Sequence, residues 1–388
     1  MSIRGKAVIV GAYEHPRREI PDRTIAQIHR EVAVGALTDA GLSLADVDAY
    51  FCDATAGFGP ITMAEHLGLA PRYVDSTETG GSSYLAHVGH AAAAIAAGKC
   101  RVALITLAGR PRTGGPPPGG TARLAGTPES GFEQVGIFSP VGNYALAASR
   151  HMHEFGTTSE QLAWIKVAAS EHAQHNPHAL LRDVVTVDDV VGSPMIADPL
   201  HRLDCCVVTD GGGALVVVHP DVARDLGRAG ATVLGHGEAV KHTDAGRIDL
   251  TYSAARWSGP AAFAEAGVTP EDIQYASIYD SFTITVLIAL EDLGFCEKGQ
   301  GGAFVADGAL RSPGGRLPFN TDGGGLCSNH PANRGGMTKV IEAVRQLRGE
   351  AHPAVQVPGC ELALAHGTGG ALSTRHGSAT LVLGAWAR

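Results

Sequence analysis

Positive charge and long apolar runs are both scarce in this sequence. Its 30 lysines and arginines face 39 aspartates and glutamates, which gives a formal net charge of −9 at pH 7. Because there is no basic stripe to neutralise phosphates, we expect no nucleic-acid partner. No apolar run approaches the roughly 18 residues that a membrane-spanning helix needs, and no signal-peptide pattern precedes the apolar run at residues 6–11. We therefore expect a cytoplasmic protein without a membrane span.

Cysteines are few, scattered and without the spacing of a zinc site. An odd number without regular spacing is typical of reduced thiols in a cytosolic protein. Histidines at 151 and 153, or at 172 and 175, could form a metal pair, but no carboxylate or cysteine clearly completes either set. We therefore expect no metal in this chain. The seven cysteines are Cys52, Cys100, Cys205, Cys206, Cys296, Cys327 and Cys360.

Apolar residues are plentiful enough for a large buried core. They make up 44% of the 388 residues, against 18% charged residues, which is typical of a globular α/β protein. Similar elements recur in one order in two halves, residues 1–225 and 226–388, with a loop excursion at about 110–200 in the first half. The predicted strands are residues 6–11, 48–53, 101–107, 214–219, 231–236, 275–279, 362–366 and 380–384. The predicted helices are residues 24–41, 63–69, 85–98, 144–155, 159–176, 260–267, 282–294 and 336–348.

Residues 75–84 (DSTETGGSSY) form a polar, glycine-containing turn that leads into the alanine-rich helix 85–98. The small side chains of that helix predict burial on every side. A turn at the start of a central buried helix is where an acyl-transfer enzyme would keep its nucleophile. This turn offers glycines and serines but no cysteine.

Several short motifs resemble those of the thiolase superfamily. They are residues 210–214 (DGGGA), 258–260 (SGP), 279–282 (YDSF), 329–331 (NHP) and 367–370 (GTGG). The chain is most similar to the sterol-carrier-protein-type thiolases, also called lipid-transfer proteins. Within that branch it resembles the steroid side-chain retro-aldolases, which work with a small OB-fold partner that carries a zinc-ribbon segment.

This resemblance implies a thiolase fold, an α/β architecture of two duplicated halves in a five-layer α-β-α-β-α stack. It implies an acyl-CoA substrate, with CoA as part of the substrate and no covalently bound cofactor. It also implies a homodimer that assembles with the small OB-fold protein into a heterotetramer. We expect the dimer to form along the central strand of the first half, residues 100–107.

The departures from the family pattern fall on catalytic positions. The resemblance places the nucleophilic cysteine of thiolases at about Gly81 and their second, proton-shuttling cysteine at His366. Tyr279 replaces the asparagine or histidine of the wider superfamily, and His330 alone of the catalytic set is plainly retained. Because glycine cannot attack a thioester, thiolysis through an acyl-cysteine is not expected.

These departures favour retro-aldol cleavage of a β-hydroxyacyl-CoA, which needs the enolate of a thiolase site but no acyl-enzyme. Candidate bases are Tyr252 and Tyr279. His330 is a candidate donor to the enolate oxygen, and His366 a candidate proton carrier. The expected products are a ketone and a short acyl-CoA such as propionyl-CoA, with a steroid side chain as the implied substrate type. The implied acyl-CoA-binding residues are Gly81, Ser82, Ser258, Gly259 and Gly369.

Two alternatives remain open on the sequence alone. Ser82, or a partner subunit, could support acyl transfer or condensation in place of the missing cysteine. As a nucleophile, the Ser82 hydroxyl would need an adjacent base. We expect instead that Ser82 or Ser83 caps the helix by accepting hydrogen bonds from the first free amides of the helix. The other alternative is a non-catalytic scaffold or lipid-binding subunit.

Overall fold

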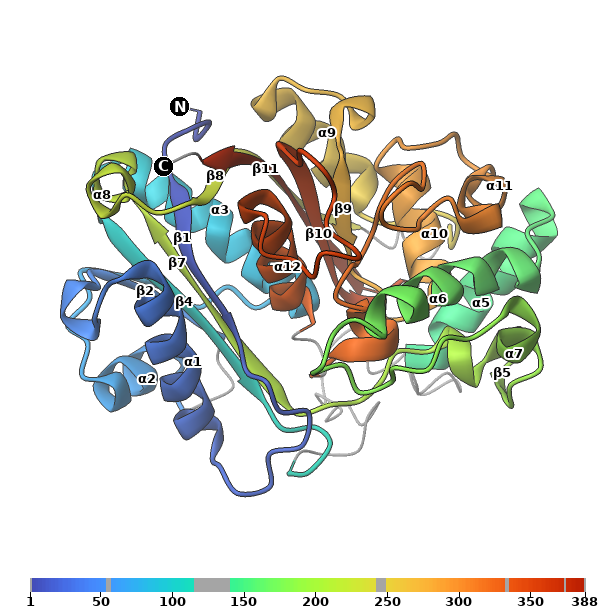
Figure 1. Ribbon diagram of the computed structural model, residues 1–388, viewed down its shortest axis with the longest axis horizontal. Coiled ribbons are helices and arrows are strands. Elements are labelled where there is room, and N and C mark those ends of the chain that lie inside the picture. The colour runs from blue at the N-terminus through green and yellow to red at the C-terminus, as the bar shows by residue number, and fades with distance from the viewer. Residues whose placement is uncertain are drawn as a thin grey trace.

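The computed structural model describes residues 2–53, 57–114, 140–241, 249–331, 335–372 and 375–386. Within these ranges, strands and helices alternate in layers, with helices both between and outside two groups of strands (Figure 1). None of the helices in this described part is long and apolar enough to cross a membrane.

The main sheet is hydrogen-bonded in the order β3-β2-β4-β7-β1-β8-β11-β10-β9. Four strands of each half repeat one arrangement, β2-β4-β7-β1 in the first and β9-β10-β11-β8 in the second, each with one parallel and two antiparallel pairs. The predicted duplication is therefore confirmed, while the boundary at residue 225 stays a prediction. The strands are β1 Val8–Glu14, β2 Ala49–Phe51, β3 Tyr73–Asp75, β4 Val102–Gly109, β7 Gly211–Val218, β8 Gly230–Lys241, β9 Tyr275–Ile278, β10 Leu362–Ala371 and β11 Arg375–Trp386, and a separate pair is β5 Met195–Ala197 with β6 Leu200–His201.

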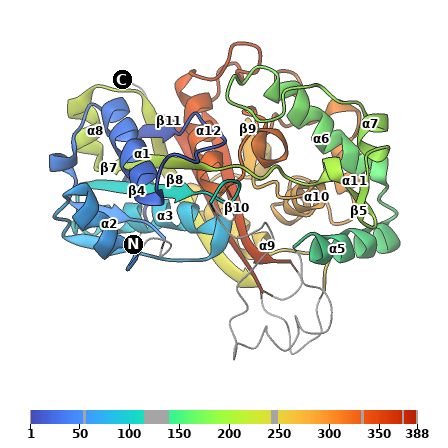
Figure 2. The ribbon, with the colours of Figure 1, turned by 90° about the horizontal axis from the view of Figure 1, so that it is seen from below.

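Helices complete the five predicted layers. The helices α3 and α12 lie between the two groups of strands, α1 and α2 lie outside the first group, and α9 and α10 lie outside the second (Figure 1). A lobe of α5, α6, α7 and α11 stands beside the second half (Figure 2). The bounds are α1 Ile25–Ala40, α2 Pro60–Leu67, α3 Ser83–Ala96, α5 Pro140–Phe155, α6 Ser159–Ala173, α7 Val187–Val191, α8 Pro220–Leu226, α9 Ala255–Ala266, α10 Thr283–Asp292, α11 Gly301–Val305 and α12 Gly336–Arg348.

The central layer is held by apolar contact with both groups of strands. One buried cluster joins Leu85 of α3 and Val340 of α12 to Ile105 of β4 and Leu383 of β11. The small residues of α3 allow the close approach, and most of its side chains are buried as expected. Among the described strands of the main sheet, the halves pair only through β1 and β8, at the pairs Val8↔Thr232 and Ile9↔Ala231. Packing on α3 and α12 therefore joins the two groups of strands.

Several local expectations differ from the structure. Strand β4 is paired with β2 on one side and β7 on the other, so the expected dimer edge at residues 100–107 is wrong. Helix α9 begins at Ala255 and carries Pro260 inside it, not at its start. Helix α6 begins at Ser159 as predicted, and its N-cap is Thr158, whose hydroxyl accepts from the Gln161 amide. Most of the predicted excursion from 110 to 200 is helical where it is described, and residues 115–139 lie outside the described ranges.

A buried ion pair connects α12 to the segment that follows β9. The Nζ of Lys339 lies 2.9 Å from Oδ1 of Asp280, and both side chains are almost fully buried. The Asp280 carboxylate also accepts from the amides of Gly325 (2.8 Å) and Leu326 (3.1 Å). It therefore fixes the turn Gly324–Ser328, which leads to His330.

We expect Lys339→Met to destabilise the protein by about 3–5 kcal/mol, because it leaves the Asp280 carboxylate buried without its cation. The matched control is Arg150→Met, which removes a solvent-exposed ion pair with Glu154 and should cost less than about 1 kcal/mol. Urea unfolding measures both. Equal, small effects of the two substitutions would contradict the structural role of the buried pair.

Candidate functional site

A cavity of about 420 Å³ opens beside the ends of β9 and β10 and the start of α5. Its wall is mainly apolar. Three of the predicted site residues, Tyr279, His330 and Gly369, line it. The lining residues are Pro111, Pro140, Val141, Tyr144, Ile196, Arg202, Cys205, Cys206, Val208, Tyr279, Ser281, Phe282, His330, Thr368, Gly369 and Gly370.

Tyr279 and His330 form an edge-to-face pair in this cavity. Their ring centroids are 5.3 Å apart and the ring planes are inclined at 70°. Tyr279 directly follows β9, and its amide donates to the carbonyl oxygen of His366 on β10 at 2.9 Å. The parallel pairing of β9 with β10 thereby fixes where the phenol stands.

The His330 imidazole is neutral and has a free nitrogen. Burial lowers the pKa of His330 to about 4, although the Asp280 carboxylate opposes that shift. Its buried Nε2 has no hydrogen-bond partner in the described part of the chain. A buried polar atom without a partner is costly, so its presence in a cavity wall indicates a group that a ligand completes.

Gly81 stands where the resemblance puts the nucleophile, and the structure leaves no space for a side chain there. A Cβ atom at this position would lie 2.4 Å from Cε2 of Tyr279 and 2.4 Å from the carbonyl oxygen of Thr368. Gly369 is equally constrained, since its Cβ would lie 1.7 Å from the carbonyl oxygen of Thr79. The Tyr279 ring thus fills the space that a catalytic thiol would need.

The Ser82 hydroxyl is used within its own turn. It donates to the carbonyl oxygen of Thr79 at 2.8 Å and to the Thr79 hydroxyl at 3.0 Å. The Ser83 hydroxyl accepts from the Thr79 amide at 2.8 Å, and α3 has no side-chain cap bond, so the expected cap through the helix amides is wrong. No histidine or carboxylate in the described residues bonds to Ser82, and the arrangement lacks the base of a serine nucleophile.

His366 does not line the cavity. Along β10 the side chains alternate, so Ala365 joins the central cluster and Leu364 the outer one. His366 shares the outer side, where its Nδ1 lies 2.9 Å from the Thr380 hydroxyl. Burial lowers the pKa of His366 to about 3, which describes a neutral core imidazole.

Ser258 and Gly259 also lie in the outer layer, inside α9. The Ser258 hydroxyl is 2.9 Å from that of Thr380. A Cβ on Gly259 would lie 2.9 Å from Cδ2 of Leu293, so this glycine allows helix packing. Neither residue lines the cavity.

Tyr252 is half-buried and lies outside the cavity wall. The Lys241 ammonium stands 4.2 Å above its ring, and the Trp257 ring meets it edge-on at 5.7 Å. The structure therefore brings together Tyr279, His330, Gly369 and the neighbouring Gly81. It does not bring Tyr252, His366, Ser258 or Gly259 to the same cavity.

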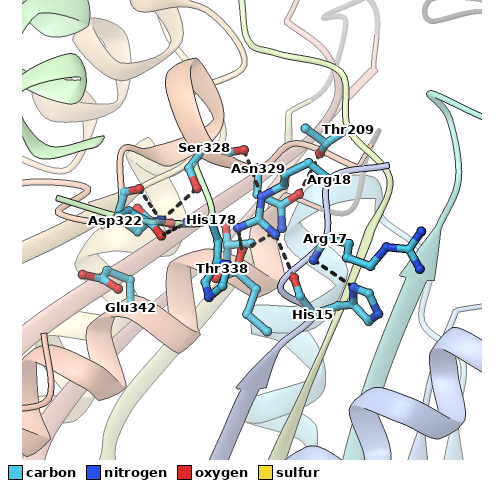
Figure 3. Close-up of polar contacts among 12 residues, drawn as sticks. His15, Arg17, Arg18, His178, Thr209, Asp322, Ser328, Asn329, Thr338 and Glu342 are labelled. Atoms are coloured by element: carbon cyan, nitrogen blue, oxygen red, sulfur yellow. Dashed lines mark hydrogen bonds and ion pairs between the residues drawn. The ribbon is translucent and has the colours of Figure 1, made fainter. Parts of the chain in front are cut away.

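A polar network behind the cavity fixes the segment that carries His330 (Figure 3). Arg18 donates from Nε to the Ser328 carbonyl oxygen at 3.1 Å. The Thr209 hydroxyl donates to Asn329 Oδ1 at 2.7 Å and accepts from the His330 amide at 2.9 Å. Asn329 Nδ2 donates to the Glu14 carboxylate at 2.7 Å.

The Glu14 carboxylate remains charged within that network. Burial raises the pKa of Glu14, but Arg18 and Arg345 outweigh the burial and hold it below its ordinary value. Because Glu14 ends β1 and Arg18 follows it, residues of the first half position the catalytic candidate of the second half.

The sequence did not point to Tyr144, Arg202 or the pair Cys205–Cys206 as cavity residues. Tyr144 lies on α5, and its approach to Phe282 depends on tertiary packing. Within the described part of the chain, no group of three or more histidines, cysteines or carboxylates could hold a metal ion. The arrangement is suited to hydrogen bonding and proton transfer.

Comparison with known proteins gives one consistent family. A model described as "Thiolase C-terminal domain-like" matches residues 237–385. The chain is 35% identical to an acetyl-CoA acetyltransferase of Methanothermobacter thermautotrophicus over 93% of this chain and 96% of that protein. It is 34% identical to a steroid side-chain-cleaving aldolase of Thermomonospora curvata over 89% of this chain and 91% of that protein. A solved structure titled "Ltp2-ChsH2(DUF35) aldolase" superposes with a TM-score of 0.89, at 32% identity and 99% coverage of both chains.

We expect Gly81→Ala to destabilise the protein by about 1–3 kcal/mol, because the added methyl group overlaps the Tyr279 ring and the Thr368 carbonyl. Gly377→Ala is the matched control, since its Cβ would have its nearest neighbour at 3.4 Å, an ordinary contact. Thermal unfolding compares the two. A Gly81→Ala variant as stable as the control would show that the position has room for a side chain.

Proposed function

The chain is a member of the thiolase superfamily, and we propose that it is a lyase that cleaves a β-hydroxyacyl-CoA by a retro-aldol reaction. The products are a ketone and a short acyl-CoA such as propionyl-CoA. The observation that carries this proposal is the Tyr279 ring in the space of the missing nucleophile. A reaction through an enolate needs no acyl-enzyme, so this pocket can perform it without a thiol.

In the proposed reaction, Tyr279 acts in its phenolate form and accepts the proton of the β-hydroxyl group. The electron pair of the bond between Cα and Cβ moves to the thioester as that bond breaks, which releases the ketone and leaves an enolate. His330 donates a hydrogen bond from Nε2 to the enolate oxygen, and a proton returned to Cα completes the acyl-CoA. The lowered pKa of His330 is compatible with this role, because the buried imidazole is neutral and a neutral imidazole can carry its one proton on Nε2.

The cavity suits a bulky apolar acyl group, and we propose one of steroid side-chain type. Val141, Ile196 and Phe282 provide apolar wall, and the volume is about 420 Å³. Arg202 stands exposed in the same lining and has no ion-pair partner in the described part of the chain. Its guanidinium is available for the phosphates of CoA, which enters as part of the substrate.

Acyl transfer or condensation is the second candidate, and the 35% identity to an acetyl-CoA acetyltransferase favours it. The filled space at Gly81 and the self-contained bonds of Ser82 weigh against it. A scaffold without activity is weaker still, because the chain is similar over about nine-tenths of its length to proteins named as an acetyltransferase and an aldolase.

We propose that two copies of the chain pair through β3 and that this cytoplasmic dimer binds a small OB-fold, zinc-ribbon protein to give a heterotetramer. Strand β3 pairs only with β2 among the described strands, and Val74 at its centre is 49% exposed. The name of the aldolase structure that superposes with a TM-score of 0.89 includes a DUF35 partner, ChsH2.

We expect Val74→Pro to convert the dimer to a monomer, because proline removes a backbone donor at the edge of the sheet. Light scattering after gel filtration measures the mass. The control is Val184→Pro, which changes an exposed valine far from any main-sheet strand in sequence. A Val74→Pro variant that remains dimeric would refute the proposal that two copies pair through β3.

The proposed reaction is tested by incubating the chain, alone and with its OB-fold partner, with a β-hydroxyacyl-CoA and following ketone release. We expect Tyr279→Phe to lower kcat by about 10²–10⁴-fold as a lost acid–base group. His330→Ala should lower it by about 10²–10³-fold as a lost enolate donor. Ser82→Ala should retain activity, since its hydroxyl bonds only to Thr79.

The pH dependence gives a further readout of the same assay. A histidine whose pKa is lowered to about 4 stays neutral from pH 8 to pH 6, so the His330 contribution should be constant over that range and should change only as the pH falls toward about 4. Activity lost in Ser82→Ala but kept in Tyr279→Phe would instead support the serine enzyme. Inertness of the wild-type complex would refute the lyase.

A further inference from the structure

Tyr144 brings a second phenol to the cavity from a different part of the fold. It lies on α5, is 3% exposed and lines the same wall as Tyr279 and His330. Its ring packs against Phe282, with centroids 4.7 Å apart and planes inclined at 31°. Because Phe282 lies three residues after Tyr279, one short segment supports both phenols.

The Tyr144 hydroxyl lies beside the residues that follow β9 and beside the end of β10. Its neighbours are the hydroxyls of Ser281 and Thr368. Thr368 is the residue whose carbonyl oxygen, together with the Tyr279 ring, closes the space at Gly81. The two phenols therefore approach one side of the reaction centre from α5 and from β9.

The surroundings keep the Tyr144 phenol protonated. Burial raises the pKa of Tyr144 to about 12, and the Ser281 and Thr368 hydroxyls only partly oppose that rise. A phenol that holds its proton is a hydrogen-bond donor at neutral pH and not a base. In an apolar cavity such a donor is strong, because water does not compete for the acceptor.

We propose that Tyr144 is a further catalytic residue whose hydroxyl donates a hydrogen bond to the thioester oxygen as the enolate forms. This inference rests on the proposed lyase function and adds a second donor to the one from His330. Packing against Phe282 holds the Tyr144 ring in place, so the hydroxyl is already positioned when the substrate binds. Its hydrogen bond to the thioester oxygen then strengthens as negative charge develops on that oxygen.

The test is Tyr144→Phe, which keeps the ring and its packing on Phe282 and removes only the hydroxyl. With the wild-type chain and its partner protein, kcat for a β-hydroxyacyl-CoA should fall by about 10²–10³-fold, as for loss of one oxyanion donor. The KM should stay within about threefold, because a donor to developing charge acts mainly in the transition state. The matched control is Tyr13→Phe, whose ring packs against Gly35 in the first half, and it should keep wild-type kcat.

Two further measurements separate catalysis from structure. Thermal unfolding should show Tyr144→Phe to be as stable as Tyr13→Phe. Calorimetric titration with the matching acyl-CoA that lacks the β-hydroxyl group should show nearly unchanged affinity. Equal kcat in Tyr144→Phe and wild type, or a rise in KM alone, would overturn the role of Tyr144 and leave the lyase intact. A wild-type complex that releases no ketone would overturn both.

Discussion

The contact between the Tyr279 ring and the Gly81 backbone determines what this pocket can do. An aromatic ring and a side chain at position 81 cannot occupy the same space, since a Cβ there would lie 2.4 Å from the ring. The glycines at 81 and 369 let the turn before α3 and the end of β10 pack backbone to backbone, and the phenol completes that packing. The phenol of Tyr279 therefore occupies the space that a nucleophilic side chain at position 81 would need. Its remaining polar groups, a neutral imidazole and two phenols, are suited to charge on substrate oxygens.

The two halves of the chain both contribute to this site, although most of the cavity belongs to the second half. His330 follows a turn that Asp280 and Lys339 hold from one side and that Arg18, Glu14 and Thr209 hold from the other. Within the described part of the main sheet, only β1 and β8 pair across the halves. The shared buried helices and this polar network give the imidazole a defined place relative to Tyr279.

Local signals predicted the layered fold well, because caps, glycine stops and apolar runs act over a few residues. Helix α1 begins at a Thr24 capping box and ends at Gly41 in the left-handed conformation, as its sequence indicates. Tyr279 and His330 were found because each stands in a family motif. His366 lies in such a motif too, but its imidazole lies 2.9 Å from the Thr380 hydroxyl in the buried core and does not line the cavity. Tyr144 carries no local signal, since its place depends on how α5 packs against the residues after β9.

The crowding at Gly81 also bears on how this protein could change over evolutionary time. One codon change can turn a glycine into a cysteine, yet here the thiol would meet both an aromatic ring and a main-chain oxygen. Acyl-cysteine chemistry at this position would require the ring to be replaced and the neighbouring backbone to shift before a new thiol conferred any benefit. Such dependence of one substitution on others makes a cysteine nucleophile hard to acquire from the present sequence.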